Sequence, residues 1–224
     1  MSPKFAAVAF DLDGTLYPNR SLYLRLAPFV LSNARFLRAF NGARNAIRRE
    51  QEANLSLARP DFYEHQAGLV AKILGKSSGD TMRKIDALMY RGLEPLFSGI
   101  RLFPHVRELL RELRAAGTKL GMLSDFPPEA KLENMGLGGI WDAALCSERT
   151  GALKPSPIPF NSMADALGVE PARILYVGNS RPYDVSGALR AGMKAALISK
   201  TSRGNPKADF TFHDYRQLRA FVLN

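Results

Sequence analysis

Two aspartates near the start of the chain, Asp11 and Asp13, have the residue type and the spacing to do chemistry. They follow residues 5–10, an uncharged run that predicts a buried strand. Because they are two positions apart, their side chains point to the same side of an extended segment. Two carboxylates held this close raise each other's proton affinity unless a cation lies between them. The pair therefore indicates a metal ion or a shared proton, although Asp-x-Asp-Gly is also typical of a solvated turn.

Other polar side chains follow later apolar runs. From residue 99 onward, strand and helix patterns alternate, which predicts right-handed βαβ units and a parallel sheet covered on both faces. The carboxyl ends of parallel strands share one edge, so polar residues that follow them are expected to converge. These residues are Ser124, Asp125, Lys154, Asn179 and Asp184. Carboxylate and amide oxygens suit Mg²⁺, and hydroxyl and ammonium donors suit a phosphoryl group.

The expected elements of this α/β core follow from apolar periodicity and from glycines that end helices. Strands are expected at residues 5–10, 119–123, 143–146, 174–177 and 195–199, with an edge strand at 210–212. Helices are expected at residues 106–113, 130–135, 161–167 and 185–191, and from residue 215 to the end.

Residues 18–97 show no strand pattern and predict an all-helical insertion between two core segments, residues 1–17 and 98–224. Apolar residues recur at three- and four-residue steps from position 22 to 47, which predicts one stripe on a long helix or helix pair. Pro28 is expected to start a new helix there or to kink one.

Two more helices and a basic face are expected in the insertion. One helix should begin at Pro60 and end near Gly75, and another should run from Ser78 toward Leu96. Seven arginines lie between residues 20 and 49, and most of them are expected on a solvated face.

The totals describe an ordinary globular chain with an excess of positive charge. Its 224 residues, 46% of them hydrophobic, suit one large domain or one core with an insertion. The single cysteine, Cys146, allows no internal disulfide, and the N-terminal residues lack the apolar core of a secretion signal. No segment reaches the ~20 uninterrupted apolar residues that span a bilayer. We therefore expect a cytoplasmic protein whose net charge of +10 favours anionic partners: phosphorylated substrates, nucleic acid or a membrane surface.

Four motifs in order resemble those of haloacid dehalogenase-like hydrolases. They are residues 10–16 (Phe-Asp-Leu-Asp-Gly-Thr-Leu), residues 123–125 (Leu-Ser-Asp), Lys154-Pro155, and residues 177–180 (Val-Gly-Asn-Ser) through Asp184. The connecting residues 103–110, 147–148 and 187–193 are similar too. The resemblance covers the core on both sides of the insertion, which stands where the family carries a helical cap. It implies a Rossmann-like core with an inserted helical cap.

The resemblance also implies roles for individual residues. Asp11 would attack phosphorus and form an aspartyl-phosphate, and Asp13 would act as the general acid and then the general base. Ser124 and Lys154 would hold the phosphoryl oxygens, with Asp125 and Thr15 as further phosphate-binding residues.

A magnesium ion is implied at Asp11, Asp13, Asn179 and Asp184, with Asp13 contributing its backbone carbonyl. The fourth motif of the family usually opens with Gly-Asp, and here it reads Gly178-Asn179. Loss of one negative charge is expected to weaken the metal site and to leave more of the binding to Asp184.

A phosphatase for a small phosphorylated metabolite is the leading hypothesis, because the dehalogenases of this family carry a non-acidic residue where this chain has Asp13. Two alternatives stay open: a non-catalytic or weakly active protein of this fold that binds an anionic partner through its basic helices, and a dehalogenase-type hydrolase. We expect no specific nucleic-acid partner, and a monomer or homodimer. The candidate substrate-lining residues, on position alone, are Tyr17, Asn19, Arg20, Phe126 and His65.

Overall fold

The computed structural model describes residues 4–199 and 207–224, and residues 21–24 by their backbone only. The start of the chain, on which the prediction of no secretion signal partly rests, lies outside these ranges, as do the side chains of Leu22 and Tyr23. In the described part, no helix combines the length and hydropathy that a membrane span requires.

Strands and helices alternate along the core as the sequence predicts. The strands are β1 (Ala7–Phe10), β2 (Lys119–Ser124), β3 (Ala143–Cys146), β4 (Ile174–Gly178), β5 (Lys194–Ile198) and β6 (Phe210–Phe212). The α-helices of the core are α4 (Val106–Ala115), α5 (Glu129–Asn134), α6 (Pro157–Leu167), α7 (Ser186–Arg190) and α8 (Tyr215–Leu223). Short 3₁₀ or π turns complete it: η3 (Ser147–Thr150), η4 (Pro171–Arg173) and η5 (Arg181–Val185).

All six strands form one parallel sheet in the order β3-β2-β1-β4-β5-β6. The strand β1 lies in the middle, where the order reverses, and Phe10 at its end pairs with Met122 of β2 and Val177 of β4. In open parallel sheets ligands bind beyond the carboxyl ends of the strands at such a switch point. The fold therefore places the end of β1 at the centre of the expected site.

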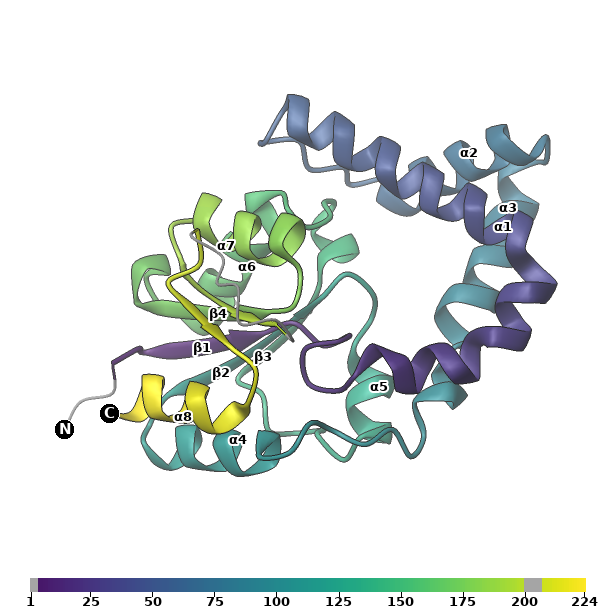
Figure 1. The fold of residues 1–224 in the computed structure, drawn as a ribbon. Helices are drawn as coiled ribbons and strands as arrows, with labels where there is room; N and C mark the ends of the chain where they lie inside the picture. The colour runs from purple at the N-terminus through teal and green to yellow at the C-terminus, as the bar shows by residue number, and fades with distance from the viewer. Residues whose placement is uncertain (1–3, 200–206) are drawn as a thin grey trace.

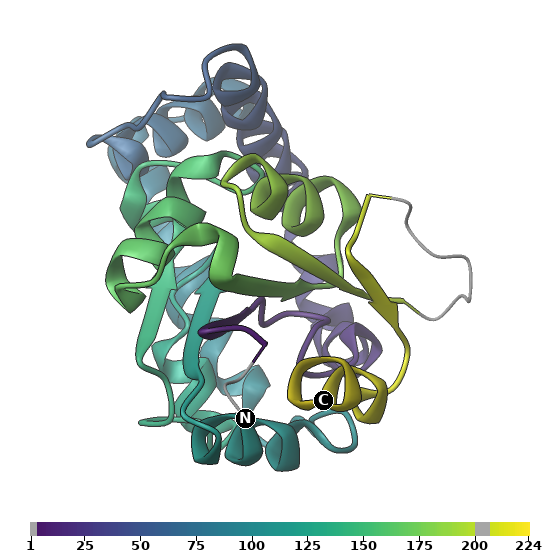
Figure 2. The ribbon, with the colours of Figure 1, turned by 90° about the vertical axis from the view of Figure 1, so that its left-hand side faces the viewer.

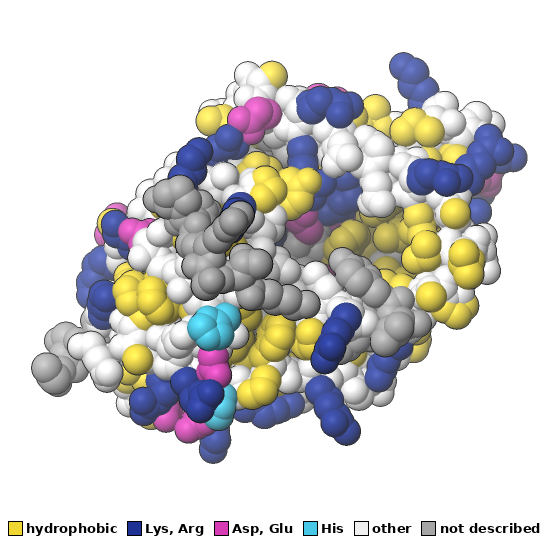
Figure 3. Space-filling view, viewed as in Figure 1, with side chains coloured by type: hydrophobic (Ala, Val, Ile, Leu, Met, Phe, Trp, Pro, Cys, Tyr) yellow, Lys and Arg dark blue, Asp and Glu magenta, His cyan; other side chains and the backbone are white. Residues whose placement is uncertain are grey.

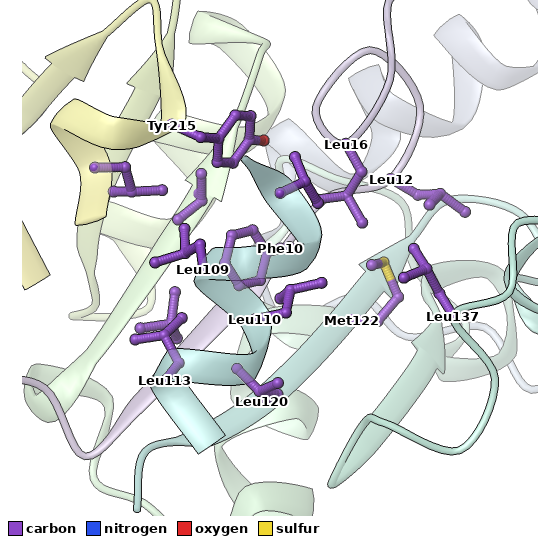
Figure 4. Close-up of a cluster of buried hydrophobic side chains, with 14 of the residues drawn as sticks. Phe10, Leu12, Leu16, Leu109, Leu110, Leu113, Leu120, Met122, Leu137 and Tyr215 are labelled. Atoms are coloured by element: carbon purple, nitrogen blue, oxygen red, sulfur yellow. The ribbon is translucent and has the colours of Figure 1, made fainter. Parts of the chain in front are cut away.

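Helices cover both faces of the sheet (Figure 2), α4 and α8 on one and α6 and α7 on the other. Because side chains alternate along a strand, Val8 and Phe10 face the first pair of helices, and Ala7 and Ala9 face the second. Figure 4 shows Phe10 surrounded by leucines of α4. Burying each such large side chain stabilises the fold by about 1.5–3 kcal/mol. This packing fixes where β1 ends.

Between β1 and β2 the described chain contains helices only, as predicted, and we call residues 19–97 the helical segment. It comprises α1 (Asn19–Ala53), α2 (Phe62–Leu74), α3 (Ser78–Ile85), the π-helix η1 (Asp86–Arg91) and the 3₁₀-helix η2 (Glu94–Phe97). The segment lies beyond the carboxyl ends of the strands (Figure 1). It has its own apolar cluster, centred on Phe36 and Phe40 of α1 and Val70 of α2.

The helical segment departs from the predicted helix bounds, although α2 begins within two residues of the expected Pro60. The first helix is interrupted at Asn33, whose φ and ψ are −123° and 19°, and not at Pro28, which lies inside the helix. At this point the side chain of Asn33 donates from Nδ2 to the Phe29 carbonyl, four residues earlier, at 3.1 Å. The helix expected from Ser78 toward Leu96 ends at Ile85 and continues as a π-helix and then a 3₁₀ turn.

An arginine of α1 joins the helical segment to the core. Although most arginines of this stretch were expected on a solvated face, Arg44 is only 4% exposed. Its guanidinium forms ion pairs with Glu148 of η3 and, at 3.2 Å, with Asp125 after β2. Burial alone would lower the pKa of Arg44, but the two carboxylates outweigh it and raise the pKa above its usual value. The arginine is therefore charged and fixed between the two parts.

Replacing Arg44 by methionine is expected to lower the free energy of unfolding by about 3 kcal/mol, because the buried Glu148 carboxylate loses its partner. Urea denaturation measures the loss. Arg35→Met, an exposed position on the same helix, is the control and should change stability by less than ~0.5 kcal/mol. Adding Glu148→Gln to Arg44→Met should restore part of the loss. Equal stability of the Arg44→Met and Arg35→Met variants would contradict the role of Arg44 as the partner of Glu148.

Candidate active site

The side chain of Lys154 lies between the carboxylates of Asp11 and Asp184, next to the carboxyl end of β1. Its Nζ donates to Asp11 Oδ1 and to Asp184 Oδ1, both at 2.7 Å, and to the Tyr176 hydroxyl at 3.2 Å. The lysine is 4% exposed. Burial alone would lower the pKa of this ammonium, but Asp11 and Asp184 outweigh it and hold the pKa well above its usual value. Lys154 is therefore a fixed positive charge.

Asp11 is the first residue after β1 and is buried. Its backbone N–H continues the sheet by donating to the Val177 carbonyl at 2.9 Å, and Thr15 Oγ1 donates to its Oδ2 at 2.8 Å. Burial, with smaller contributions from Asp184 and Asp13, raises the pKa of Asp11 to about 7, although Lys154 opposes the rise. Two carboxylates on one ammonium leave a surplus negative charge, so this position favours a further cation.

Asp184 lies at the same edge of the sheet and is held by the backbone after β4. Its Oδ2 accepts from the N–H groups of Asn179 at 3.1 Å and Ser180 at 2.9 Å. A Cβ at Gly178 would stand 2.3 Å from the Asp184 Cβ, so only glycine allows this approach. Asn179 in turn donates from Nδ2 to the Asp13 backbone carbonyl at 3.1 Å. The fourth motif therefore reaches the first one directly.

The carboxylate of Asp13 is 31% exposed, whereas that of Asp11 is 10% exposed. Lys131 Nζ donates to Asp13 Oδ2 at 2.8 Å, and the buried hydroxyl of Tyr17 donates to Oδ1. The sequence predicted a helix around Lys131 but no role for the lysine, because a lone lysine in a short helix is typical of a solvated surface. Only the fold places it, 8% exposed, beside Asp13 and over the Phe97 ring at 4.6 Å.

The second motif follows β2, where Ser124 is 1% exposed and its hydroxyl accepts from the Phe126 N–H at 3.2 Å. The neighbouring Asp125 carboxylate binds Arg48 at 2.8 Å and Arg44 at 3.2 Å. Burial alone would raise the pKa of Asp125, but Arg44, Lys154 and Arg48 together lower it. Because its carboxylate is turned to these arginines, Asp125 has only its backbone to offer a phosphate. Phosphate binding at Asp125 stays a prediction, with its backbone as the donor.

A cavity of about 740 Å³ begins at Asp13 and extends between the core and α1. Asn19 and Phe126 line it, as predicted from their positions. Three other residues expected there do not line it: Tyr17 is buried beneath Asp13, Arg20 is exposed, and His65 Nε2 pairs with Glu50 at 3.0 Å. For Tyr17, Arg20 and His65 the expectation of lining the substrate site is therefore corrected.

The oxygens at this edge fit a hard divalent cation. They are the carboxylates of Asp11 and Asp184, the backbone carbonyl of Asp13 and the amide of Asn179. Within residues 4–199 and 207–224, no three His, Cys, Asp or Glu side chains form a metal-binding group, so the set depends on the carbonyl and the amide. In the structure the Asn179 nitrogen faces the Asp13 carbonyl, so the amide would have to rotate for its oxygen to bind the same cation as that carbonyl.

Known proteins resemble this chain along nearly its whole length. A glyceraldehyde 3-phosphate phosphatase of Methanopyrus kandleri is 29% identical over 87% of this chain and 84% of its own. A phosphoglycolate phosphatase of Haemophilus influenzae is 28% identical over 97% of this chain and 98% of its own. A HAD phosphatase structure from Thermococcus onnurineus superposes with a TM-score of 0.64 at 25% identity, over 99% of this chain and 97% of that one.

An L-2-haloacid dehalogenase from Xanthobacter autotrophicus has the same fold, with a TM-score of 0.65 over 97% of this chain and 98% of that one. Its sequence is only 20% identical, so the likeness concerns the fold and not the reaction. The family model that matches residues 5–192 is that of the haloacid dehalogenase-like hydrolases. It spans all four motifs and the helical segment between the first two. The chain belongs to the haloacid dehalogenase-like hydrolase family.

Proposed function

We propose that this protein is a magnesium-dependent phosphatase that hydrolyses a small phosphorylated metabolite through an aspartyl-phosphate. One observation carries the proposal: the buried Asp11 carboxylate, fixed by Lys154 and Thr15, lies beside a second, more exposed carboxylate that borders the cavity. One carboxylate is thus held in a defined orientation, and the other can exchange protons. Related phosphatases of the same family support the reaction class.

In the proposed first step, an oxygen of Asp11 attacks phosphorus and the bond from phosphorus to the alcohol oxygen breaks. Asp13 gives its proton to the leaving alcohol. The ammonium of Lys154 and the hydroxyl of Ser124 stabilise the charge that spreads over the phosphoryl oxygens. Phosphoryl transfer needs such positioning more than covalent chemistry from other side chains.

In the proposed second step, Asp13 takes a proton from water, and the water attacks phosphorus of the aspartyl-phosphate. Inorganic phosphate leaves and the Asp11 carboxylate is regenerated. Lys131 and Tyr17 hold the two oxygens of Asp13, so its carboxylate keeps one orientation through both steps.

A magnesium ion would be held by Asp11, Asp184, Asn179 and the backbone carbonyl of Asp13. It would screen the carboxylate nucleophile from the anionic substrate. The raised pKa of Asp11 supports this placement, because burial disfavours its charge until a cation offsets it. Asn179 supplies a neutral oxygen where the family usually has a carboxylate, so we expect weaker metal binding than an aspartate would give.

We further infer that residues 18–97 act as a cap over a core of residues 1–17 and 98–224. Side chains of α1 and η2 form walls of the cavity that begins at Asp13.

The two alternative functions receive less support. A departing halide needs no proton from Asp13, and Arg44 and Arg48, two of the seven basic residues offered for an anionic partner, are paired inside the protein.

Asp11→Asn is expected to lower kcat/KM for phosphate release by at least about 10³-fold, because an amide cannot form the aspartyl-phosphate. A screen of phosphorylated metabolites with and without Mg²⁺, read as released inorganic phosphate, measures this. Asp165→Asn, an exposed carboxylate on α6, is the matched control and should keep full activity. Equal turnover by the wild type and Asp11→Asn would remove Asp11 as the nucleophile.

Asn179→Asp is expected to lower the half-saturating Mg²⁺ concentration by roughly tenfold, because a carboxylate replaces a neutral ligand. Activity against Mg²⁺ concentration and calorimetric titration of the metal both report it. Asn161→Asp adds the same charge at an exposed position of α6 and should leave Mg²⁺ binding unchanged. An unchanged Mg²⁺ dependence in Asn179→Asp would show that Asn179 is not a ligand.

Gly14→Ala tests the turn that holds the first and fourth motifs together. Gly14 has a φ of 86°, and a Cβ there would stand 2.0 Å from Asn179 Nδ2, so Asn179 must move and activity should fall by about 10²-fold. Gly75→Ala is the control, because Gly75 has a φ of 66° but open space around its Cβ position. Both variants should lose about 1 kcal/mol of stability, and only Gly14→Ala should lose activity. Comparable activities would contradict the role of this contact.

A further inference from the structure

The first helix carries an apolar stripe that lines the cavity. Leu26 and Val30 precede the interruption at Asn33, Ala34 and Leu37 follow it, each pair is spaced by one helical turn, and all four line the cavity. We call them the cavity stripe. Val30 is 43% exposed. The stripe therefore faces a space that opens from the catalytic aspartates.

A different stripe of the same helix holds the helical segment together. Phe36, Phe40 and Ala43 are at most 4% exposed and pack against Ala67 and Val70 of α2. Leu37 of the cavity stripe also packs against this cluster, and Leu26 packs against the core, whereas Val30 and Ala34 belong to neither cluster. The apolar character of Val30 and Ala34 thus calls for another explanation than the stability of the segment.

The opposite walls of the cavity are also apolar and partly aromatic. They consist mainly of Met89, Tyr90, Leu93, Phe97 and Phe126. In Figure 3, hydrophobic side chains gather around a hollow on this face of the molecule. The polar and charged lining residues apart from Asp13 and Lys131 are Asn19, Arg38, Asn41 and Glu94.

The size of the cavity bears on what could fill it. Pockets of ~300–1,000 Å³ bury ligands of drug size, and this one measures about 740 Å³. A three-carbon polar alcohol, such as the one released by glyceraldehyde 3-phosphate, would leave most of the apolar walls in contact with water. Apolar surface gains about 25 cal/mol per Å² when a ligand removes it from water, so a larger apolar group would bind better.

We propose, on the basis of the phosphatase function above, that the alcohol part of the substrate is a large and mostly apolar group that occupies this cavity. The phosphoryl group lies at Asp11, and the ester oxygen meets Asp13. Lys131 marks the boundary, because its ammonium contacts Asp13 at 2.8 Å and the ring faces of Phe97 and Phe126 at 4.6 and 5.5 Å. Beyond it, the apolar body packs between the cavity stripe and the aromatic wall.

Two primary alkyl phosphates test the proposal at similar intrinsic reactivity: ethyl phosphate and naphthylethyl phosphate. The wild-type protein with Mg²⁺ is expected to hydrolyse naphthylethyl phosphate with a kcat/KM about tenfold or more above that of ethyl phosphate. It should also prefer it to glyceraldehyde 3-phosphate. Ala34→Phe fills the cavity and should bring the ratio of the two alkyl esters close to one. Ala27→Phe adds the same ring at an exposed position of α1 outside the cavity and should leave the ratio unchanged.

The outcomes separate this proposal from the phosphatase assignment. Equal turnover of the two alkyl esters, or a preference for glyceraldehyde 3-phosphate, overturns the apolar substrate and leaves the phosphatase function intact. Hydrolysis of none of the three esters overturns the phosphatase function. In that case, equilibrium binding to the Asp11→Asn protein decides the rest: naphthylethyl phosphate binding about tenfold more tightly than ethyl phosphate supports the apolar cavity, and equal affinities overturn it.

Discussion

The contact between the Lys154 ammonium and the carboxylates of Asp11 and Asp184 is the interaction on which the rest of the site depends. Removing three charges from water is costly, and only close geometry with further hydrogen bonds offsets that cost. The sheet supplies the geometry, because β1 and β4 are neighbours and end at the same level. The backbone N–H groups of Asn179 and Ser180 supply the further hydrogen bonds. The sheet order and the buried charges thus depend on each other.

The same lysine also connects the core with the helical segment. Its carbonyl accepts from Arg48 at 2.9 Å, and its N–H donates to Asp125 at 3.3 Å. Asp125 then pairs with Arg44, whose guanidinium lies 4.4 Å from the Phe126 ring centroid. One chain of contacts therefore runs from the carboxylates of Asp11 and Asp184 to a wall of the cavity. A shift of α1 would change contacts at Lys154 as well as the shape of the cavity.

The core could be predicted from the sequence because local patterns determine it. Apolar runs of strand length, glycines at helix ends and polar residues directly after the strands were enough to place Asp11, Ser124 and Lys154 at one edge. The interruption at Asn33 could not be predicted in the same way, because a proline nearby was the stronger local signal. The burial of Arg44 and Lys131 could not be predicted either, since a buried charge on a helix has the same local pattern as an exposed one. Their partners are distant in sequence, Glu148 and Asp13, and only the fold brings them near.

The cavity beside α1 shows most clearly where sequence patterns stop being informative. Apolar residues at three- and four-residue steps predict a helix face that avoids water, but the pattern is the same whether protein or ligand covers that face. On α1 the face of Phe36 and Phe40 is covered by α2, and the face of Val30 and Ala34 is left to the cavity. In the proposed function, the motifs at the strand ends would determine which bond is broken. The face of α1 that lines the cavity would determine which molecule brings that bond to Asp11, so one core could serve different substrates.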